Sequence, residues 1–223
     1  MGDTASRVLL FALVAAASPV ALLATLAVLT SRHGRRNGIA YLAGFLAGQT
    51  IAFVTAVLVG SAASTDHEEN DELAAVLELA FGLLLLVLAW PERRRRSEPA
   101  GQGRMKSLIE RLRGLRAWTA FAVGILLGVG GVKRLSITIV AGASVGFAGL
   151  APAEEVALGA LYVLVAGVLV WAPVGAYLVA GERADRWMLR AEGWLTANGR
   201  RLAFFSTAFF GFLLTSDALI RLV

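Results

Sequence analysis

The sequence contains no cysteine, and it contains only two histidines, His33 and His67, among 223 residues. The lack of cysteine excludes disulfides and thiol catalysis, and two histidines alone do not make a metal-binding cluster. The HExxH motif of zinc peptidases and the GxxxxGK[ST] motif of nucleotide-binding proteins are also missing. We therefore expect no enzyme, no catalytic or metal-binding residues and no cofactor.

Charged residues are scarce, at 17% of the chain, whereas 57% of the residues are hydrophobic and the mean hydropathy is +0.71. The charges are confined to short segments. Apolar runs of about twenty residues separate them, which is the length that an α-helix needs to cross a ~30 Å hydrocarbon core. The net charge of +5 does not indicate nucleic-acid binding, because the basic residues lie between the apolar runs. This pattern predicts an all-α integral membrane protein.

Six apolar runs are long enough to be membrane spans: Val8–Leu29, Gly38–Gly60, Leu73–Trp90, Trp118–Leu150, Val156–Ala180 and Leu202–Leu219. The connections after the first, third and fifth runs are basic, and those after the second and fourth are acidic. Because basic loops stay on the cytoplasmic side, this alternation predicts a multi-pass plasma-membrane protein with both termini outside. Pro173 is expected to kink the fifth run, and Gln49 and Tyr162 are expected to form hydrogen bonds between helices.

The expected spans divide the chain into a first three-helix repeat (1–91), a basic cytoplasmic linker (92–117) and a second three-helix repeat (118–223). In the cytoplasmic connections, residues 104–118 and 182–195 carry apolar residues at helical spacing among basic ones. Basic amphipathic helices lie in the membrane interface and favour anionic lipids. We expect both segments to act as interfacial anchors, with docking of a partner protein as the alternative.

Lys133 and Arg134 lie near the middle of the fourth run, where an ionisable residue is costly and by default marks a functional site. The glycine-rich stretch before them, which ends at Gly131, favours a break in the helix. Such a break is tolerated where the backbone lines a cavity or is buried in protein. Two cations beside a break predict a site for a phosphate, sulfate or carboxylate head group. Two alternatives remain: Lys133 lies near an interface between two short segments, or the cations pair with Glu78.

Ser18-Pro19 occupies the corresponding place in the first run, and a proline inside a helix removes a backbone donor and produces a kink. The first and fourth runs open the two halves of the chain and enter the membrane from opposite sides. Interrupted helices at matching positions of two oppositely oriented halves are typical of inverted-repeat transporters, although packing alone also places Pro and Gly in membrane helices. We therefore predict two inverted repeats, with Ser18, Pro19 and Gly131 at the substrate site beside the two cations.

Two carboxylates also fall inside expected spans, Glu78 in the third and Asp217 in the sixth. Either is a candidate proton-coupling group or counter-ion for the cations, and either alternatively reaches the outer interface and is solvated. In the second span, Gly44 and Gly48 form the GxxxG spacing of packed membrane helices. This spacing leaves a homodimer open.

Several short blocks follow one another along nearly the whole chain. They are Ala17-Ser18-Pro19-Val20, the segment GRRNGIA at 34–40, Leu42-Ala43-Gly44, Lys133, Ala141-Gly142-Ala143, Ala172-Pro173-Val174, Gly181-Glu182-Arg183-Ala184, Trp194-Leu195, Asn198 and Asp217. In their order and spacing the chain resembles the GAP family of actinobacterial glycolipid-addressing proteins, which includes the sulfolipid-addressing protein and belongs to the lysine-exporter superfamily. That family tends to show Pro-Lys-Asn where this chain has Val132-Lys133-Arg134, so the lysine matches and a cation is added.

The resemblance implies export or delivery of cell-envelope lipids. Together with the predicted anion site, it favours a transporter that exports or flips an envelope glycolipid, or its anionic head-group precursor, across the plasma membrane. The partners implied are membrane lipid, anionic lipid head groups and envelope-lipid biosynthesis proteins. Two alternatives stay open: a non-transporting membrane adaptor for lipid-biosynthesis enzymes, and an exporter of small amino acids or ions.

Overall fold

The computed structural model describes residues 2–63, 110–112 and 114–222, and every regular element that it assigns there is helical. The elements are α1 (Gly2–Ala16), α2 (Pro19–Leu29), α3 (Gly34–Ala63), α6 (Ala117–Val129), α7 (Val132–Phe147), α8 (Pro152–Ala166), α9 (Val168–Ala180), the short 3-10 helix η1 (Gly181–Ala184) and α10 (Asp185–Leu222). The expected third span, at 73–90, and most of the expected linker lie outside the described residues.

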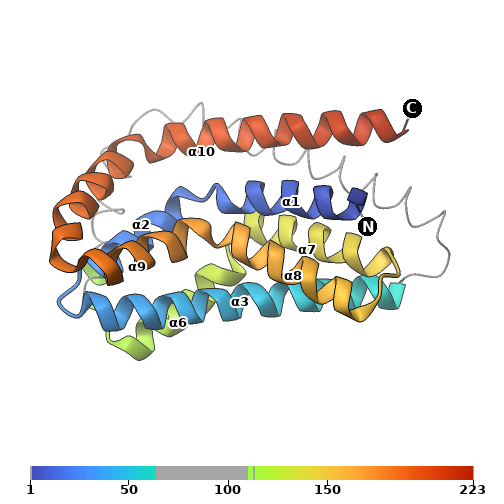
Figure 1. The fold of residues 1–223 in the computed structure, drawn as a ribbon. Helices are drawn as coiled ribbons and strands as arrows, with labels where there is room; N and C mark the ends of the chain where they lie inside the picture. The colour runs from blue at the N-terminus through green and yellow to red at the C-terminus, as the bar shows by residue number, and fades with distance from the viewer. Residues whose placement is uncertain (1, 64–109, 113, 223) are drawn as a thin grey trace.

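The helices form an elongated bundle with a common long axis (Figure 1). Among the described residues, α3 alone is long and apolar enough to cross a membrane by itself, and the number rises to four if each of three bent helix pairs is one span. The bends measure 57° between α1 and α2, 64° between α6 and α7, and 67° between α8 and α9. The first, second, fourth and fifth expected spans are thus helical, and the protein is a helical membrane protein.

The first apolar run is broken rather than merely kinked. Ser18 is the N-cap of α2, and Pro19 is the first residue of that helix. Proline is favoured at this position because its missing N–H would have no intrahelical partner there. Pro19 therefore starts a second helix, and the interruption that the sequence predicts here is present.

The fifth run bends at Gly167, which separates α8 from α9, whereas Pro173 lies inside α9. The 67° bend of this run therefore falls at Gly167 and not at Pro173, and a kink at Pro173 stays a prediction. Gly167 has no Cβ and so contributes little to helix stability. The break is stabilised by a side chain, because Trp171 Nε1 donates a hydrogen bond to the Leu164 carbonyl oxygen at 2.8 Å.

The last element is one long helix. The sequence predicts an amphipathic segment at 182–195 and a separate span at 202–219, but α10 runs from Asp185 to Leu222 without interruption. The basic residues at 200–201 do not end the helix, because arginine is a good helix former. Figure 1 shows the first part of α10 curving across one end of the bundle and the rest running back along it.

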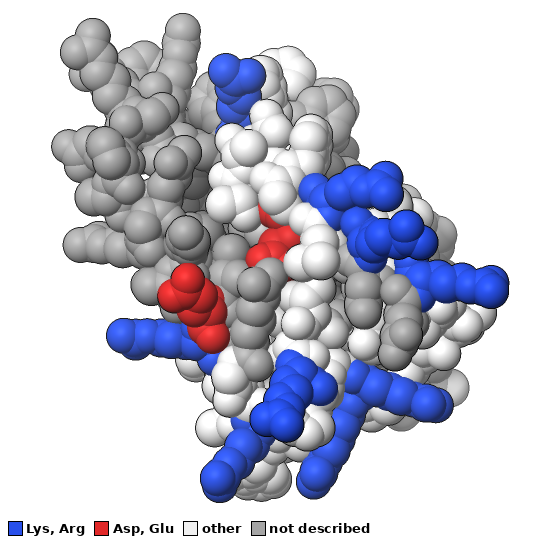
Figure 2. Space-filling view, turned by 90° about the vertical axis from the view of Figure 1, so that its left-hand side faces the viewer, with Lys and Arg blue, Asp and Glu red and all other residues white. Residues whose placement is uncertain are grey.

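At one end of the bundle α2 and α9 end and α3 and α6 begin (Figure 1). Figure 2 views this end directly and shows Lys and Arg side chains around it. The exposed arginines of these segments, here called the basic end, are Arg32, Arg35, Arg36, Arg111, Arg116, Arg183, Arg186 and Arg190. The acidic connection with Glu154 and Glu155 lies at the opposite end. The described basic connections therefore share one end, as the charge alternation predicts.

Glycines bring α3 into direct backbone contact with α6 and α7. A Cβ added to Gly44 or Gly48 of α3 would lie within 3 Å of backbone atoms of Phe121 or Ile125 on α6. Close approach to α3 is also made by four glycines of the partner helices: Gly124 and Gly128 of α6, and Gly142 and Gly146 of α7. The GxxxG spacing of α3 is thus used within the chain, in the way that small residues let membrane helices approach.

Candidate functional site

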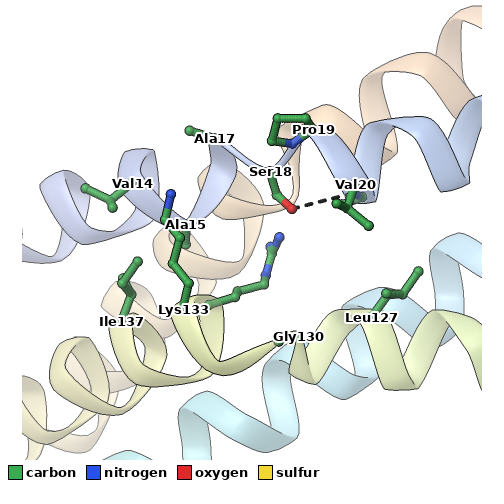
Figure 3. Close-up of a pocket in the computed structure, with 13 residues that line it drawn as sticks. Val14, Ala15, Ala17, Ser18, Pro19, Val20, Leu127, Gly130, Lys133 and Ile137 are labelled. Carbon is green, nitrogen blue, oxygen red and sulfur yellow. Dashed lines mark hydrogen bonds between the residues drawn. The ribbon is translucent and has the colours of Figure 1, made fainter. Parts of the chain in front are cut away.

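The breaks of α1/α2 and α6/α7 face each other across a cavity of about 370 Å³ (Figure 3). Five of its lining residues are those that the sequence singles out: Ser18, Pro19, Gly131, Lys133 and Arg134. Its other lining residues are apolar side chains or glycine. Two helix interruptions that are far apart in the sequence therefore meet at one place, near the middle of the long axis of the bundle (Figure 1).

The described part of the structure does not include the side chains of Glu78 and Asp217, the two carboxylates named from the sequence. Glu78 lies outside the described part of the chain, as does its suggested pairing with the cations. Asp217 belongs to α10, but its side chain lies outside the described part.

Gly130 determines the shape of the second break. Its φ of 87° and ψ of 176° lie in a region that essentially only glycine adopts, and a Cβ there would lie 2.6 Å from the Arg134 Cβ. Gly131 instead has an extended backbone, with φ −77°, and open space around its Cβ position. The sequence analysis names Gly131 as a site residue, but the break depends on its neighbour Gly130. The backbone angles and the space around the Cβ positions distinguish the two.

The N-termini of α2 and α7 both lie at the cavity, because Ser18 and Gly131 are their N-cap residues. The Ser18 Oγ accepts a long hydrogen bond from the Ala21 N–H, at 3.5 Å. Helix N-termini carry partial positive charge. With Lys133 and Arg134 alongside, the described lining carries positive and no negative side chains.

Lys133 and Arg134 are adjacent in the sequence but differ in their surroundings. Lys133 is half-buried, and Figure 3 shows its side chain extending from α7 toward the end of α1 beside Ala15. Arg134 is 7% exposed. The two residues diverge because successive helical positions are about 100° apart around the axis.

Arg134 is held by three neighbours. Its Nη2 donates hydrogen bonds to Gln49 Oε1 and to the Ala166 carbonyl oxygen, each at 2.8 Å. Its guanidinium also lies over the Phe45 ring, 4.6 Å from the centroid, in a cation–π arrangement. No carboxylate among the described residues pairs with it, so neutral dipoles and an aromatic face stabilise this buried charge. The expected interhelical hydrogen bond of Gln49 is confirmed.

A second polar pair lies one turn further along α7. Thr138 Oγ1 donates to the Arg134 carbonyl oxygen at 2.9 Å, and it lies 2.8 Å from the Tyr162 hydroxyl. Because the only hydroxyl hydrogen of Thr138 is used, the Tyr162 hydroxyl is the donor in this second bond. The Phe53 ring stacks on Tyr162 with a centroid distance of 4.7 Å. The expected interhelical hydrogen bond of Tyr162 is therefore also confirmed.

Residues 142–146 read GASVG and match the GxSxG spacing of hydrolase nucleophiles. In hydrolases that serine lies on a sharp turn between a strand and a helix. Ser144 lies inside α7 instead, is buried, and donates to the Val140 carbonyl oxygen at 2.8 Å. This spacing serves packing, because Gly142 and Gly146 are the glycines that approach α3.

A sequence profile described as Sap, sulfolipid-1-addressing protein, matches residues 8–219. The chain belongs to the sulfolipid-1-addressing protein family. This confirms the resemblance read from the short blocks, and the matched range contains every residue that lines the cavity. Membership in this family indicates a role in handling envelope lipids. Searches of curated proteins and of solved structures find no match to the chain.

Proposed function

We propose that the protein carries the anionic head group of an envelope lipid across the plasma membrane, and that the cavity between the two breaks holds this head group. The observation that carries the proposal is the pair of cations, Lys133 and Arg134, at the meeting point of two broken helices. A mid-membrane cation is costly and is retained where function needs it.

The directions of the broken helices support an inverted arrangement. The chain runs through α1 and α2 toward the basic end, and it runs through α6 and α7 away from that end (Figure 1). Transporters with inverted repeats place their substrate between such oppositely directed, discontinuous helices. We infer six spans in two halves, 1–91 and 118–223, with the basic end in the cytoplasm. Both termini lie at the other end in Figure 1 and are then outside.

The lining favours a compact oxyanion over a sugar. Lys133 and Arg134 donate hydrogen bonds but cannot accept them, and Ser18 has the only hydroxyl among the lining side chains that the structure describes. A sugar hydroxyl buried without a partner costs roughly 1–3 kcal/mol. We therefore infer that the cavity takes a sulfate or phosphate ester, while the sugar and the acyl chains stay outside it.

Reconstituted vesicles test this proposal with sulfated galactosylceramide that carries a fluorescent acyl chain. Dithionite destroys fluorescence in the outer leaflet only, so loss of the remaining signal reports movement from the inner leaflet. The matched lipid is unsulfated galactosylceramide, and each lipid is measured with and without an imposed proton gradient. We expect the protein to accelerate movement of the sulfated lipid alone.

The variant Lys133→Ala removes one charge-assisted hydrogen bond, worth about 2 kcal/mol, which corresponds to roughly a 30-fold loss of flux. Arg32→Ala, at the exposed basic end, is the control and should keep the wild-type rate. Equal movement of both lipids, or unchanged flux in Lys133→Ala, would argue against the proposed site.

One observation supports a second candidate function, a non-transporting adaptor for lipid-biosynthesis enzymes. Trp187 and Trp194 on the first part of α10 are 60% and 57% exposed, near exposed Arg186 and Arg190. Such a surface suits an anionic membrane surface or a partner protein. Protein that binds a biosynthetic enzyme through this surface and shows no sulfate-dependent flux would favour the adaptor. Flux of amino acids in the same vesicles would favour the small-solute exporter.

A further inference from the structure

Arg134 lines the cavity and also contacts a third helix break, the one between α8 and α9, which is not part of the cavity lining. Its guanidinium contacts α3 through Gln49 and Phe45, and it contacts the end of α8 through the Ala166 carbonyl. Ala166 is the last residue of α8, immediately before the 67° bend to α9. One side chain thus joins the cavity to a bend in another span.

The Ala166 carbonyl accepts this bond because the bend leaves it without its usual backbone donor. In a continuous helix, the Val170 N–H would donate to Ala166. Here it donates to the Gly167 carbonyl oxygen at 2.8 Å, and so does the Trp171 N–H at 3.0 Å. The carbonyl lies at a helix C-terminus, where partial negative charge favours a cation. The contact with Arg134 therefore stabilises the bend.

The geometry of the guanidinium limits how Arg134 can hold an anion at the same time. A guanidinium presents two edges for two-point contact with an oxyanion, Nε with Nη2 and Nη1 with Nη2, and both edges include Nη2. The two hydrogens of Nη2 are already donated to Gln49 and Ala166. Nε has no partner among the described residues, although it is buried. An oxyanion can thus complete a two-point contact with Arg134 only by displacing one of these two acceptors.

We propose that Arg134 couples head-group binding to the α8/α9 bend: an oxyanion in the cavity binds two nitrogens of its guanidinium and displaces the Ala166 carbonyl. The inference rests on the proposed function, because it assigns the head-group site to the same cavity. It requires a ligand with at least two free anionic oxygens, such as a sulfate or phosphate ester. It also gives the two cations different roles. Lys133 contributes binding affinity, whereas Arg134 makes the α8/α9 bend depend on whether a head group occupies the cavity.

The chain has no cysteine, so a pair of spin labels can be placed without removing native residues. Val156 on α8 and Val179 on α9 are 72% and 91% exposed and lie on either side of the bend. We would measure the distance between labels at Val156→Cys and Val179→Cys in lipid nanodiscs that contain sulfated galactosylceramide. Unsulfated galactosylceramide is again the control lipid. We expect a second distance population that grows with the sulfated lipid only.

Two variants separate coupling from a merely structural role. Gln49→Ala removes one competitor for Nη2, so binding of the sulfated lipid should become roughly tenfold tighter. A purely structural Gln49–Arg134 bond predicts unchanged or weaker binding, because its loss would loosen the site. Arg134→Lys keeps the charge but lacks the planar guanidinium that can bind two oxygens of an oxyanion at once. It should bind the sulfated lipid without producing the second distance population.

The outcomes for this inference and for the proposed function differ. If the wild-type protein binds and moves the sulfated lipid while the label distance stays unchanged, the coupling is refuted and the proposed function stands. If the wild-type protein shows no sulfate-dependent binding, the proposed function and the coupling fail together. Should Arg134→Lys fail to fold, the wild-type distances and the sign of the Gln49→Ala effect still decide the matter.

Discussion

Replacing Gly130 with alanine should destabilise the protein strongly, although it adds a single methyl group. The backbone angles of Gly130, φ 87° and ψ 176°, belong to a region that costs other residues about 1–3 kcal/mol. The new Cβ would also lie 2.6 Å from the Arg134 Cβ, which is not the movable end of a side chain. Overpacking of this kind costs about 1–3 kcal/mol. Together, Gly130→Ala should lower the free energy of unfolding by about 2–6 kcal/mol.

The neighbouring glycine provides the control. Gly131 has φ −77° and no heavy atom within 4 Å of its Cβ position, so Gly131→Ala should cost only what alanine costs at a helix N-cap, about 1 kcal/mol. Both variants and the wild type would be unfolded in detergent with a chemical denaturant and followed by far-UV circular dichroism. Equal losses in the two variants would refute the reasoning, because the break would then not depend on the conformation of Gly130.

Two further substitutions test the packing around the site. Gly48→Leu places a side chain against the Ile125 backbone and should separate α3 from α6, with a loss of thermal stability, whereas Gly193→Leu, in open space, should have little effect. Thermal unfolding in detergent compares the two. Tyr162→Phe removes the buried donor to Thr138 and should cost about 1 kcal/mol. Thr138→Val alone should also destabilise, and the double variant should lose less than the sum; additive losses would show that the two hydroxyls do not interact.

Both cavity-forming breaks are predictable from the sequence because each has a strong local cause. A proline in the middle of an apolar run cannot continue the hydrogen-bond pattern of the helix, and Ser18 before it is a favourable N-cap. The glycine-rich stretch before Lys133 likewise permits a conformation that other residues avoid. Local chemistry of this kind needs no tertiary information. In the fifth run, by contrast, the 67° bend falls at Gly167, a single glycine, and not at Pro173, which lies inside α9.

The different surroundings of Lys133 and Arg134 are not predictable from the sequence. Both residues are cations in the same apolar run, and their difference arises from the rotation of α7 about its own axis. That rotation is determined by contacts such as the close approach of Gly142 and Gly146 to α3. The role of the Ala166 carbonyl as an acceptor is likewise not predictable from the sequence. A backbone carbonyl inside a helix becomes available only where a bend removes its backbone N–H donor.

The glycine contacts along α3 hold one wall of the cavity, formed by α6 and α7, more closely than the wall formed by α1 and α2. The backbones of α6 and α7 contact the backbone of α3 directly at these glycines, so no flexible side chains separate the helices there. The chain has no glycine between residues 3 and 33, so among the described residues α2 makes this kind of contact with α3 only at its last residue, Leu29, against Gly34. The rest of α1 and α2 is held by packing against α3, α7, α8, α9 and α10. We therefore expect the wall of α6 and α7 to stay in place and the wall of α1 and α2 to move when a ligand is admitted, so that Ser18 and Pro19 are displaced while Gly130 is not.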